Sequence, residues 1–110
     1  MPSRTGMNIL PETYRRLGQH HNIVAVKEAD TSITKLQKAI ALCGDTIDFY
    51  IGNDDMIAAA TLLGCKGVIS VLANILPLYT HNITFEGING NAKICSKMQS
   101  EVIDIVEALF

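Results

Sequence analysis

Three short strand-like runs, each followed by a segment with helical periodicity, constrain the fold more than any other feature of the sequence. They cover residues 23–26, 47–51 and 67–71 and recur at intervals of about twenty to twenty-five residues. Runs with little alternation between apolar and polar residues are typical of strands covered on both faces. Strands that alternate with helices in this way predict an α/β fold with a parallel sheet and right-handed connections.

The segments between and after these runs carry helix signals. Pro11 occupies a first helical position, Thr31 or Ser32 can cap a second helix, and Pro77 opens a later one. The predicted helices cover 11–19, about 33–43, about 55–63 and 77–86, with a last helix after the turn at 87–91. In that last helix the apolar stripe that we expect in a core or an interface consists of Cys95, Met98, Val102, Ile105 and Leu109.

Composition narrows the class of protein. The chain has the length of one small domain, and its 48% apolar content is sufficient to build a core. A net charge of -2, with basic and acidic residues scattered along the chain, favours neither a nucleic-acid partner nor a membrane surface. Three cysteines that are far apart indicate neither a disulfide framework nor a zinc site. We therefore expect a cytoplasmic, soluble protein with no metal and no cofactor.

Lys27 is the first candidate for chemistry, because the run at 23–26 delivers it to the carboxyl end of a strand. Burial disfavours the ammonium form of lysine. A partly desolvated lysine can therefore lose its proton near neutral pH and attack a carbonyl to form a Schiff base. The alternative is that Lys27 extends its charged end into solvent at a strand end.

The aspartate pair Asp54–Asp55 allows a metal site or a structural role. We favour the structural role, in which one aspartate caps the following helix and the other lies at the positive end of its dipole. A dinucleotide site is disfavoured, because Lys-Glu-Ala-Asp rather than a glycine-rich turn follows the first strand. Periodicity leaves open a small doubly wound sheet or a piece of an eight-stranded barrel, which typically needs about 250 residues.

An ordered set of motifs resolves this ambiguity by resemblance. Pro-Ser-Arg-Thr-Gly, Leu-Pro-Glu-Thr, Asn-Ile-Val-Ala-Val-Lys-Glu-Ala, Gly-Asn-Asp-Asp and Gly-Val-Ile-Ser-Val-Leu-Ala-Asn stand at 2–6, 10–13, 22–29, 52–55 and 67–74. In order and spacing they resemble the carboxyl-terminal part of the dihydrodipicolinate synthase family of Schiff-base pyruvate aldolases. The resemblance implies a lyase with a TIM (β/α)8 barrel that condenses pyruvate with aspartate semialdehyde, on the way to diaminopimelate and lysine.

The resemblance also implies roles for individual residues. Lys27 resembles the lysine that forms the Schiff base with pyruvate, and Arg4 resembles the arginine that binds a substrate carboxylate near the entrance. Gly52 and Ile69 resemble rim positions whose main chain helps to enclose the active site. An N-acetylneuraminate lyase is the weaker alternative, because its corresponding turn is not expected to carry Ser-Arg-Thr-Gly.

The expected architecture is the C-terminal half of such a barrel. It forms one partial domain, with barrel units over about 1–75 and C-terminal helices over 76–110. By resemblance, the amino-terminal half would hold the threonine–tyrosine proton relay. Open strand edges favour association, so we expect a homo-oligomer or a complementary half-barrel as partner. The remaining alternative is a non-catalytic half-barrel that serves as an interaction module.

Overall fold

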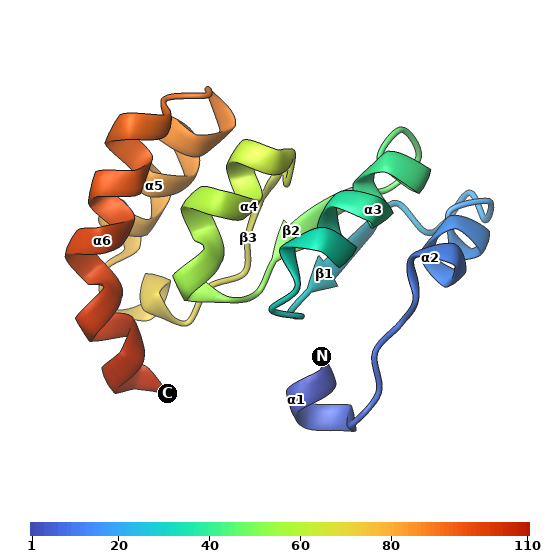
Figure 1. The fold of residues 1–110 in the computed structure, drawn as a ribbon, viewed down its shortest axis with the longest axis horizontal. Helices are drawn as coiled ribbons and strands as arrows, with labels where there is room; N and C mark the ends of the chain where they lie inside the picture. Colours follow the sequence, from blue (N-terminus) through green and yellow to red (C-terminus); the bar gives the residue numbers. More distant parts are fainter.

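The computed structural model describes residues 1–110 and contains one three-stranded parallel sheet with six α-helices (Figure 1). The strands are β1 (Ala25–Glu28), β2 (Asp48–Ile51) and β3 (Gly67–Val68), in that spatial order. In the register, Lys27 lies beside Tyr50, and Tyr50 lies beside Gly67. The predicted parallel α/β fold is therefore confirmed.

The helices begin and end near the predicted signals. They are α1 (Pro2–Thr5), α2 (Pro11–Leu17), α3 (Ile33–Cys43), α4 (Ile57–Leu63), α5 (Pro77–Ile88) and α6 (Ala92–Leu109), with short 3-10 turns η1 (Asp54–Met56) and η2 (Leu72–Asn74). Proline occupies a first position in α1, α2 and α5. Ser32 caps α3, because its Oγ accepts a hydrogen bond from the Lys35 amide at 3.2 Å. None of the helices combines the length and the apolar composition that crossing a bilayer requires.

The first core cluster covers one face of the sheet, along which α3 and α4 lie in Figure 1. Phe49 at its centre contacts Tyr14 of α2 edge-on, with ring centroids 5.7 Å apart. The buried members are Tyr14, Leu36, Ala39, Cys43, Ile47, Phe49, Ile51, Met56, Ala60 and Cys65. Burying each large apolar side chain contributes about 1.5–3 kcal/mol, so this cluster fixes α2 and α3 against β2.

The second core cluster lies among α4, α5 and α6. Its buried members are Ile57, Ala58, Leu72, Ile83, Cys95, Val102 and Val106. Gly87 lets α5 approach α4 closely, since a Cβ atom there would lie 1.9 Å from the Thr61 Oγ1 atom. Because α5 extends to Ile88, Gly87 lies within the helix, and the turn covers 89–91 rather than the predicted 87–91.

The opposite face of the sheet is open, which contradicts the expectation of a strand covered on both faces. Ala25 and Lys27, which alternate with the more buried Val26 and Glu28 along β1, are both exposed. No element of residues 1–110 packs over these side chains. An unalternating apolar run therefore does not guarantee two covered faces in this chain.

Two further details differ from the predictions. β3 ends at Val68 rather than Val71, because the amides of Val71 and Leu72 donate to the Asp54 carboxylate instead of continuing the ladder. In α6 the buried positions include Val106, whereas Ile105 and Leu109 of the predicted stripe are exposed. After Val102, both Ile105 and Val106 fit the period of 3.6 residues per turn, so spacing alone did not decide which of them is buried.

Candidate active site

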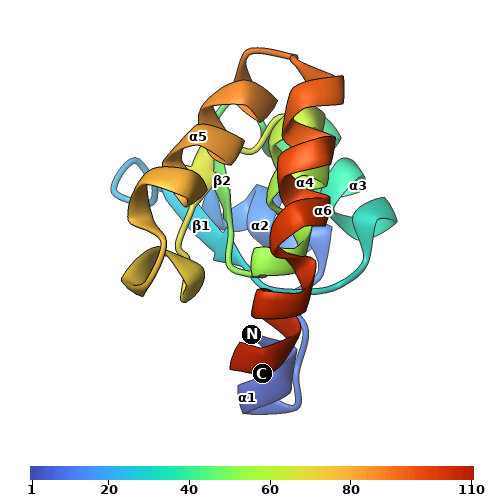
Figure 2. The same ribbon diagram turned by 90° about the vertical axis from the view of Figure 1, so that its left-hand side faces the viewer.

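A hollow of about 520 Å³ lies at the carboxyl ends of the three strands. In Figures 1 and 2 both chain ends lie at this end of the molecule. The hollow is lined by Met1, Ser3, Arg4, Lys27, Ala29, Thr31, Gly52, Asn53, Asp54, Asp55, Ile69, Ser70, Val71, Val106, Glu107 and Phe110. All four residues singled out in the sequence, Arg4, Lys27, Gly52 and Ile69, are brought together here although they come from four separate segments.

Lys27 projects from β1 into this hollow and is exposed, so the predicted desolvation of its side chain is wrong for this chain. The open face of the sheet is the reason, because nothing covers the lysine there. Gly52 makes room for the side chain. A Cβ atom at Gly52 would lie 2.6 Å from the Lys27 Cε atom, so any side chain there would displace the lysine.

Arg4 and Ile69 flank the hollow from different elements. Arg4 lies on the single-turn helix α1, is exposed, and takes part in neither of the two ion pairs of the chain, Lys35–Asp30 and Lys38–Glu12. Ile69 follows β3, and its amide donates to the Ile51 carbonyl at 2.9 Å, so its backbone is fixed to β2. Arg4 is therefore available to bind an anion, and Ile69 shapes the rim.

Asp54 holds the loop that follows β3, a role that sequence reasoning missed. It is 2% exposed, and its carboxylate accepts hydrogen bonds from the Ser70 hydroxyl and from the Val71 and Leu72 amides, the latter two at 3.0 Å. The hypothesis that an aspartate caps the following helix is therefore wrong, since neither η1 nor α4 has a side-chain cap. A doubled aspartate after a strand was the available signal, but it did not reveal the partner loop.

Gln99 of α6 extends this link to the helical part of the chain. Its Nε2 atom donates to the Asp54 carbonyl at 2.8 Å, and its Oε1 atom accepts from the Ala58 amide at 3.0 Å. The rim at β2 and β3 is thus tied to α4 and α6. The polar position Gln99 inside an otherwise apolar stripe was the signal in the sequence.

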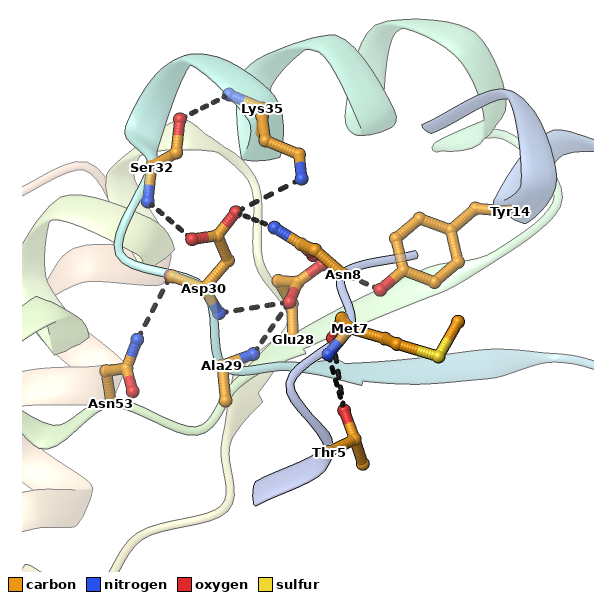
Figure 3. A network of polar contacts seen from close by, with 10 residues as sticks. All are labelled: Thr5, Met7, Asn8, Tyr14, Glu28, Ala29, Asp30, Ser32, Lys35 and Asn53. Atoms are coloured by element: carbon orange, nitrogen blue, oxygen red, sulfur yellow. Dashed lines mark hydrogen bonds and ion pairs between the residues drawn. The ribbon is translucent and has the colours of Figure 1, made fainter. Parts of the chain in front are cut away.

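Glu28, which follows Lys27 directly, is buried at 6% exposure and fixes the end of β1 (Figure 3). One carboxylate oxygen accepts from the Tyr14 hydroxyl at 2.7 Å, and the other accepts from the Ala29 and Asp30 amides at 2.9 and 3.0 Å. Burial and the adjacent Glu28 carboxylate raise the pKa of Tyr14 well above its usual range. No sequence spacing pointed to this pair.

Asp30 is the second acidic centre of the network in Figure 3. Its carboxylate accepts from Asn8 Nδ2 at 2.6 Å and from the Ser32 amide at 3.3 Å, and lies 3.4 Å from Lys35 Nζ. The hydrogen bond from Asn8 is the largest of the effects that lower the pKa of Asp30. The Asp30 carbonyl accepts from Asn53 Nδ2 at 3.0 Å, which joins the loops after β1 and β2.

The hollow offers no obvious metal ligands. No group of three or more His, Cys, Asp or Glu side chains in residues 1–110 has an arrangement that could hold a metal ion. The Asp54 carboxylate is already occupied by hydrogen-bond donors from the loop after β3. What the site offers chemically is an amine, a guanidinium and a rim of main-chain groups.

Comparison with known proteins places this geometry in a family. A sequence model of the dihydrodipicolinate synthetase family matches residues 1–110. The chain belongs to this family. Over 110 residues it is 48% identical to the 4-hydroxy-tetrahydrodipicolinate synthase of Caldicellulosiruptor saccharolyticus and 44% identical to that of Clostridium novyi. Each match covers the whole chain and 37% of the relative, so the chain spans little more than a third of the length of these proteins.

Solved structures of the dihydrodipicolinate synthetase family have the same fold over this length. The dihydrodipicolinate synthase of Thermotoga maritima matches with a TM-score of 0.94 and 31% identity, over 100% of this chain and 39% of that one. The chloride-inhibited enzyme of Acinetobacter baumannii complexed with pyruvate matches with a TM-score of 0.96 and 27% identity, covering 38% of that chain. CdNal from Clostridium difficile is 20% identical and shows the shared fold alone.

Proposed function

We propose that this chain is the lysine-bearing part of a 4-hydroxy-tetrahydrodipicolinate synthase, which condenses pyruvate with L-aspartate 4-semialdehyde through a Schiff base on Lys27. The observation that supports this most is the single hollow of about 520 Å³ shared by Arg4, Lys27, Gly52 and Ile69. An amine and a guanidinium facing one space suit a small 2-keto acid, whose ketone and carboxylate need one group each.

The proposed chemistry assigns one task to each group. The Lys27 amine attacks the ketone carbon of pyruvate, loss of water leaves an imine, and a proton from solvent converts it to the iminium. Loss of a methyl proton gives an enamine, whose carbon forms the new bond to the aldehyde carbon of the second substrate. Arg4 binds a substrate carboxylate with its rigid guanidinium fork, and Gly52 leaves room for the lysine.

Proton transfer is the step that the lining residues do not supply well. No tyrosine, histidine or cysteine lines the hollow, the Asp54 carboxylate is held by loop donors, and the two remaining carboxylates, Asp55 and Glu107, are exposed. A positioned acid or base typically contributes about 10²- to 10⁴-fold to the rate of such steps. We therefore expect residues 1–110 to form the Schiff base. The condensation should be slow unless further residues add a positioned acid or base to the site.

Borohydride trapping tests the proposal. The folded chain is incubated with pyruvate and borohydride, and the adduct is located by intact-protein and peptide mass spectrometry. We expect a pyruvate-sized adduct on Lys27 that is absent in Lys27→Ala. Lys66→Ala is the matched control, because Lys66 precedes β3 and lines a separate hollow of about 230 Å³. No adduct on a folded sample would refute the proposal and favour a non-catalytic interaction module.

The proposed architecture is half of a TIM (β/α)8 barrel, with barrel units over about 1–75 and helices over 76–110 in one partial domain. Both outer edges of the sheet, on β1 and β3, are unpaired, and the face that carries Ala25 and Lys27 is exposed. Such surfaces favour association with a second copy or with a complementary half. Size-exclusion chromatography should show association at micromolar concentration, and a well-folded monomer would contradict it.

The proposed location is the cytoplasm. All three cysteines are free and buried, as is usual for proteins of a reducing compartment.

A further inference from the structure

The position of Arg4 cannot be set by the packing of its own helix. Helix α1 has four residues, none of them buried, and the following segment exposes Met7 at 74%. Its helical hydrogen bonds are three local backbone bonds, which join Arg4 and Thr5 to the Met1 carbonyl and Gly6 to the Pro2 carbonyl. A single turn of this length is marginal on its own. Another contact must hold it beside Lys27.

Asn8 provides that contact. Its Nδ2 atom donates to Asp30 Oδ2 at 2.6 Å, across 22 residues of sequence. Figure 3 shows Asn8 turned towards Asp30 from the irregular segment that follows α1. Between Arg4 and Asn8 the chain is compact, because Thr5 Oγ1 bonds with both the amide and the carbonyl of Met7. Fixing Asn8 therefore also restricts where Arg4 can lie.

Asp30 is fixed independently of Asn8. Its carboxylate accepts from the Ser32 amide and pairs with Lys35 of α3. Its own amide donates to Glu28 at 3.0 Å, and its carbonyl accepts from Asn53 at 3.0 Å. Asp30 lies three residues after Lys27. A carboxylate fixed by several contacts is thus presented to Asn8 on the segment that carries Arg4.

On the basis of the function proposed above, we propose that Asn8 and Asp30 are positioning residues that set the distance between the Arg4 guanidinium and the Lys27 amine. Neither residue lines the hollow, so neither touches the reacting atoms. The pair acts by holding the carboxylate-binding group where the ketone of the same small molecule reaches Lys27. Precise placement of two groups in this way is what makes binding productive.

A residue swap isolates this hydrogen bond. In Asn8→Asp, two carboxylates face each other and the bond is lost. In the double variant Asn8→Asp/Asp30→Asn, the amide on residue 30 can donate to the new carboxylate, and its carbonyl oxygen can still accept from Ser32. Lys35 Nζ lies 3.4 Å from Asp30 Oδ2, the same atom that Asn8 contacts, so we expect it to pair with the relocated charge. The swap therefore restores the contact with its direction reversed.

The first readout is borohydride trapping as a function of pyruvate concentration. In Asn8→Asp we expect the half-saturating pyruvate concentration to rise roughly tenfold, which corresponds to the loss of one hydrogen bond to a charged group. The adduct yield at saturating pyruvate should stay unchanged, because Lys27 itself is intact. The double variant should return the half-saturating concentration to within about twofold of the original, on the same energy scale.

Asn91→Asp is the matched control. Asn91 Nδ2 donates to Glu86 Oε2 at 2.6 Å, so the substitution removes an equally short amide–carboxylate bond. Asn91 lies between α5 and α6 and does not line the hollow. We expect no change in the pyruvate dependence of this variant. A similar change in both variants would attribute the effect to added negative charge and overturn the proposal.

A second readout does not depend on the chemistry of Lys27. Spin labels on Ser3→Cys and Gln37→Cys report the distance from α1 to α3, since both positions are exposed and the three native cysteines are buried. We expect a narrow distance distribution that broadens in Asn8→Asp and narrows again in the swap. Unchanged distributions would overturn the proposal. If no pyruvate adduct forms at all, the proposed function fails, and the label distances still decide the role of the pair.

Discussion

The two core clusters of the molecule are closed to different degrees. The cluster among α4, α5 and α6 is enclosed by helices and contains only aliphatic side chains and one cysteine. The cluster on the sheet is covered by α2, α3 and α4 on one face, while the other face of the sheet lies open at the hollow. The candidate active site is therefore built on the less packed side of the molecule.

The polar contacts of the two regions differ accordingly. Around the hollow, Glu28, Asp30 and Asp54 join segments that are 14 to 22 residues apart through hydrogen bonds. Among the helices, the hydroxyls of Thr61 and Thr80 donate to carbonyls three or four residues earlier, and only Gln99 and Tyr79 make longer-range polar contacts. The comparison teaches that the helical region depends mainly on apolar packing with a few polar links, whereas the loops around the site are held chiefly by hydrogen bonds between distant segments.

The largest effects should come from the centres of the two clusters. Phe49→Ala should lower the free energy of unfolding by about 3–5 kcal/mol and Ile83→Ala by about 2–5 kcal/mol. Because α4 contributes to both clusters, we expect one shared transition in urea, followed by circular dichroism and tyrosine fluorescence. Two separate transitions, or an Ile83→Ala variant whose tyrosine fluorescence transition is unchanged, would show that the two regions unfold independently.

Gly87→Ala tests the closeness of the helical packing. The new methyl group would overlap Thr61, so we expect a loss of about 1–3 kcal/mol in the free energy of unfolding. Denaturant titration measures the loss. The double variant Gly87→Ala/Thr61→Ala should lose less than the sum of the single variants, since removing the hydroxyl makes room. Strict additivity would mean that the two helices do not meet there.

Tyr14→Phe tests the hydrogen-bonded region. It leaves the buried Glu28 carboxylate short of one donor, and we expect a loss of about 1–2 kcal/mol at neutral pH. Tyr79→Phe is the control and should cost less, because its bond to Glu101 is exposed. A loss for Tyr14→Phe no larger than that for Tyr79→Phe would contradict the importance of the buried contact.

The same contact predicts a pH dependence. Burial raises the pKa of Tyr14 in the folded state above the value of about 10 in the unfolded chain. The protonated phenol therefore stabilises the fold below pH 10, and this contribution is lost as the pH rises further. Unfolding measured between pH 8 and 11 should show a smaller alkaline loss in Tyr14→Phe than in the unchanged chain. This prediction fails if the two chains lose stability in parallel.

Gly52→Ala should have the smallest effect on stability and a clear effect on chemistry. The new methyl group would meet the Cε atom near the end of the flexible Lys27 side chain, so the lysine moves while the fold stays. We expect the free energy of unfolding to change by less than about 0.5 kcal/mol and the yield of the Lys27 adduct to fall. Compared with Gly87→Ala, this separates a glycine that serves packing from one that serves the site.

Much of the fold could be predicted because its signals are local. Pro11 and Pro77 begin helices, Ser32 caps one, and Gly44 follows the end of α3, as propensity and capping chemistry require. The resemblance also identified four residues that meet in one hollow. The family match over residues 1–110 confirmed the resemblance itself.

The missed features depend on contacts between distant segments. The exposure of Lys27 follows from what covers the sheet, which periodicity does not report. The roles of Asp54 and Glu28 require knowing that Ser70 and Tyr14 lie beside them in space. A capping rule that considers only neighbours in sequence therefore assigned one of the paired aspartates to the following helix, and it missed the contact of Asp54 with the loop after β3.

The way in which Asp54 holds the rim has a consequence for engineering. Two of its three donors, at Val71 and Leu72, are backbone amides, which every residue except proline supplies. The Val71 side chain lines the hollow but takes no part in the clamp. A library that varies residue 71 across all non-proline side chains should thus retain the loop conformation, and it offers a route to a hollow of different shape and polarity on an unchanged scaffold.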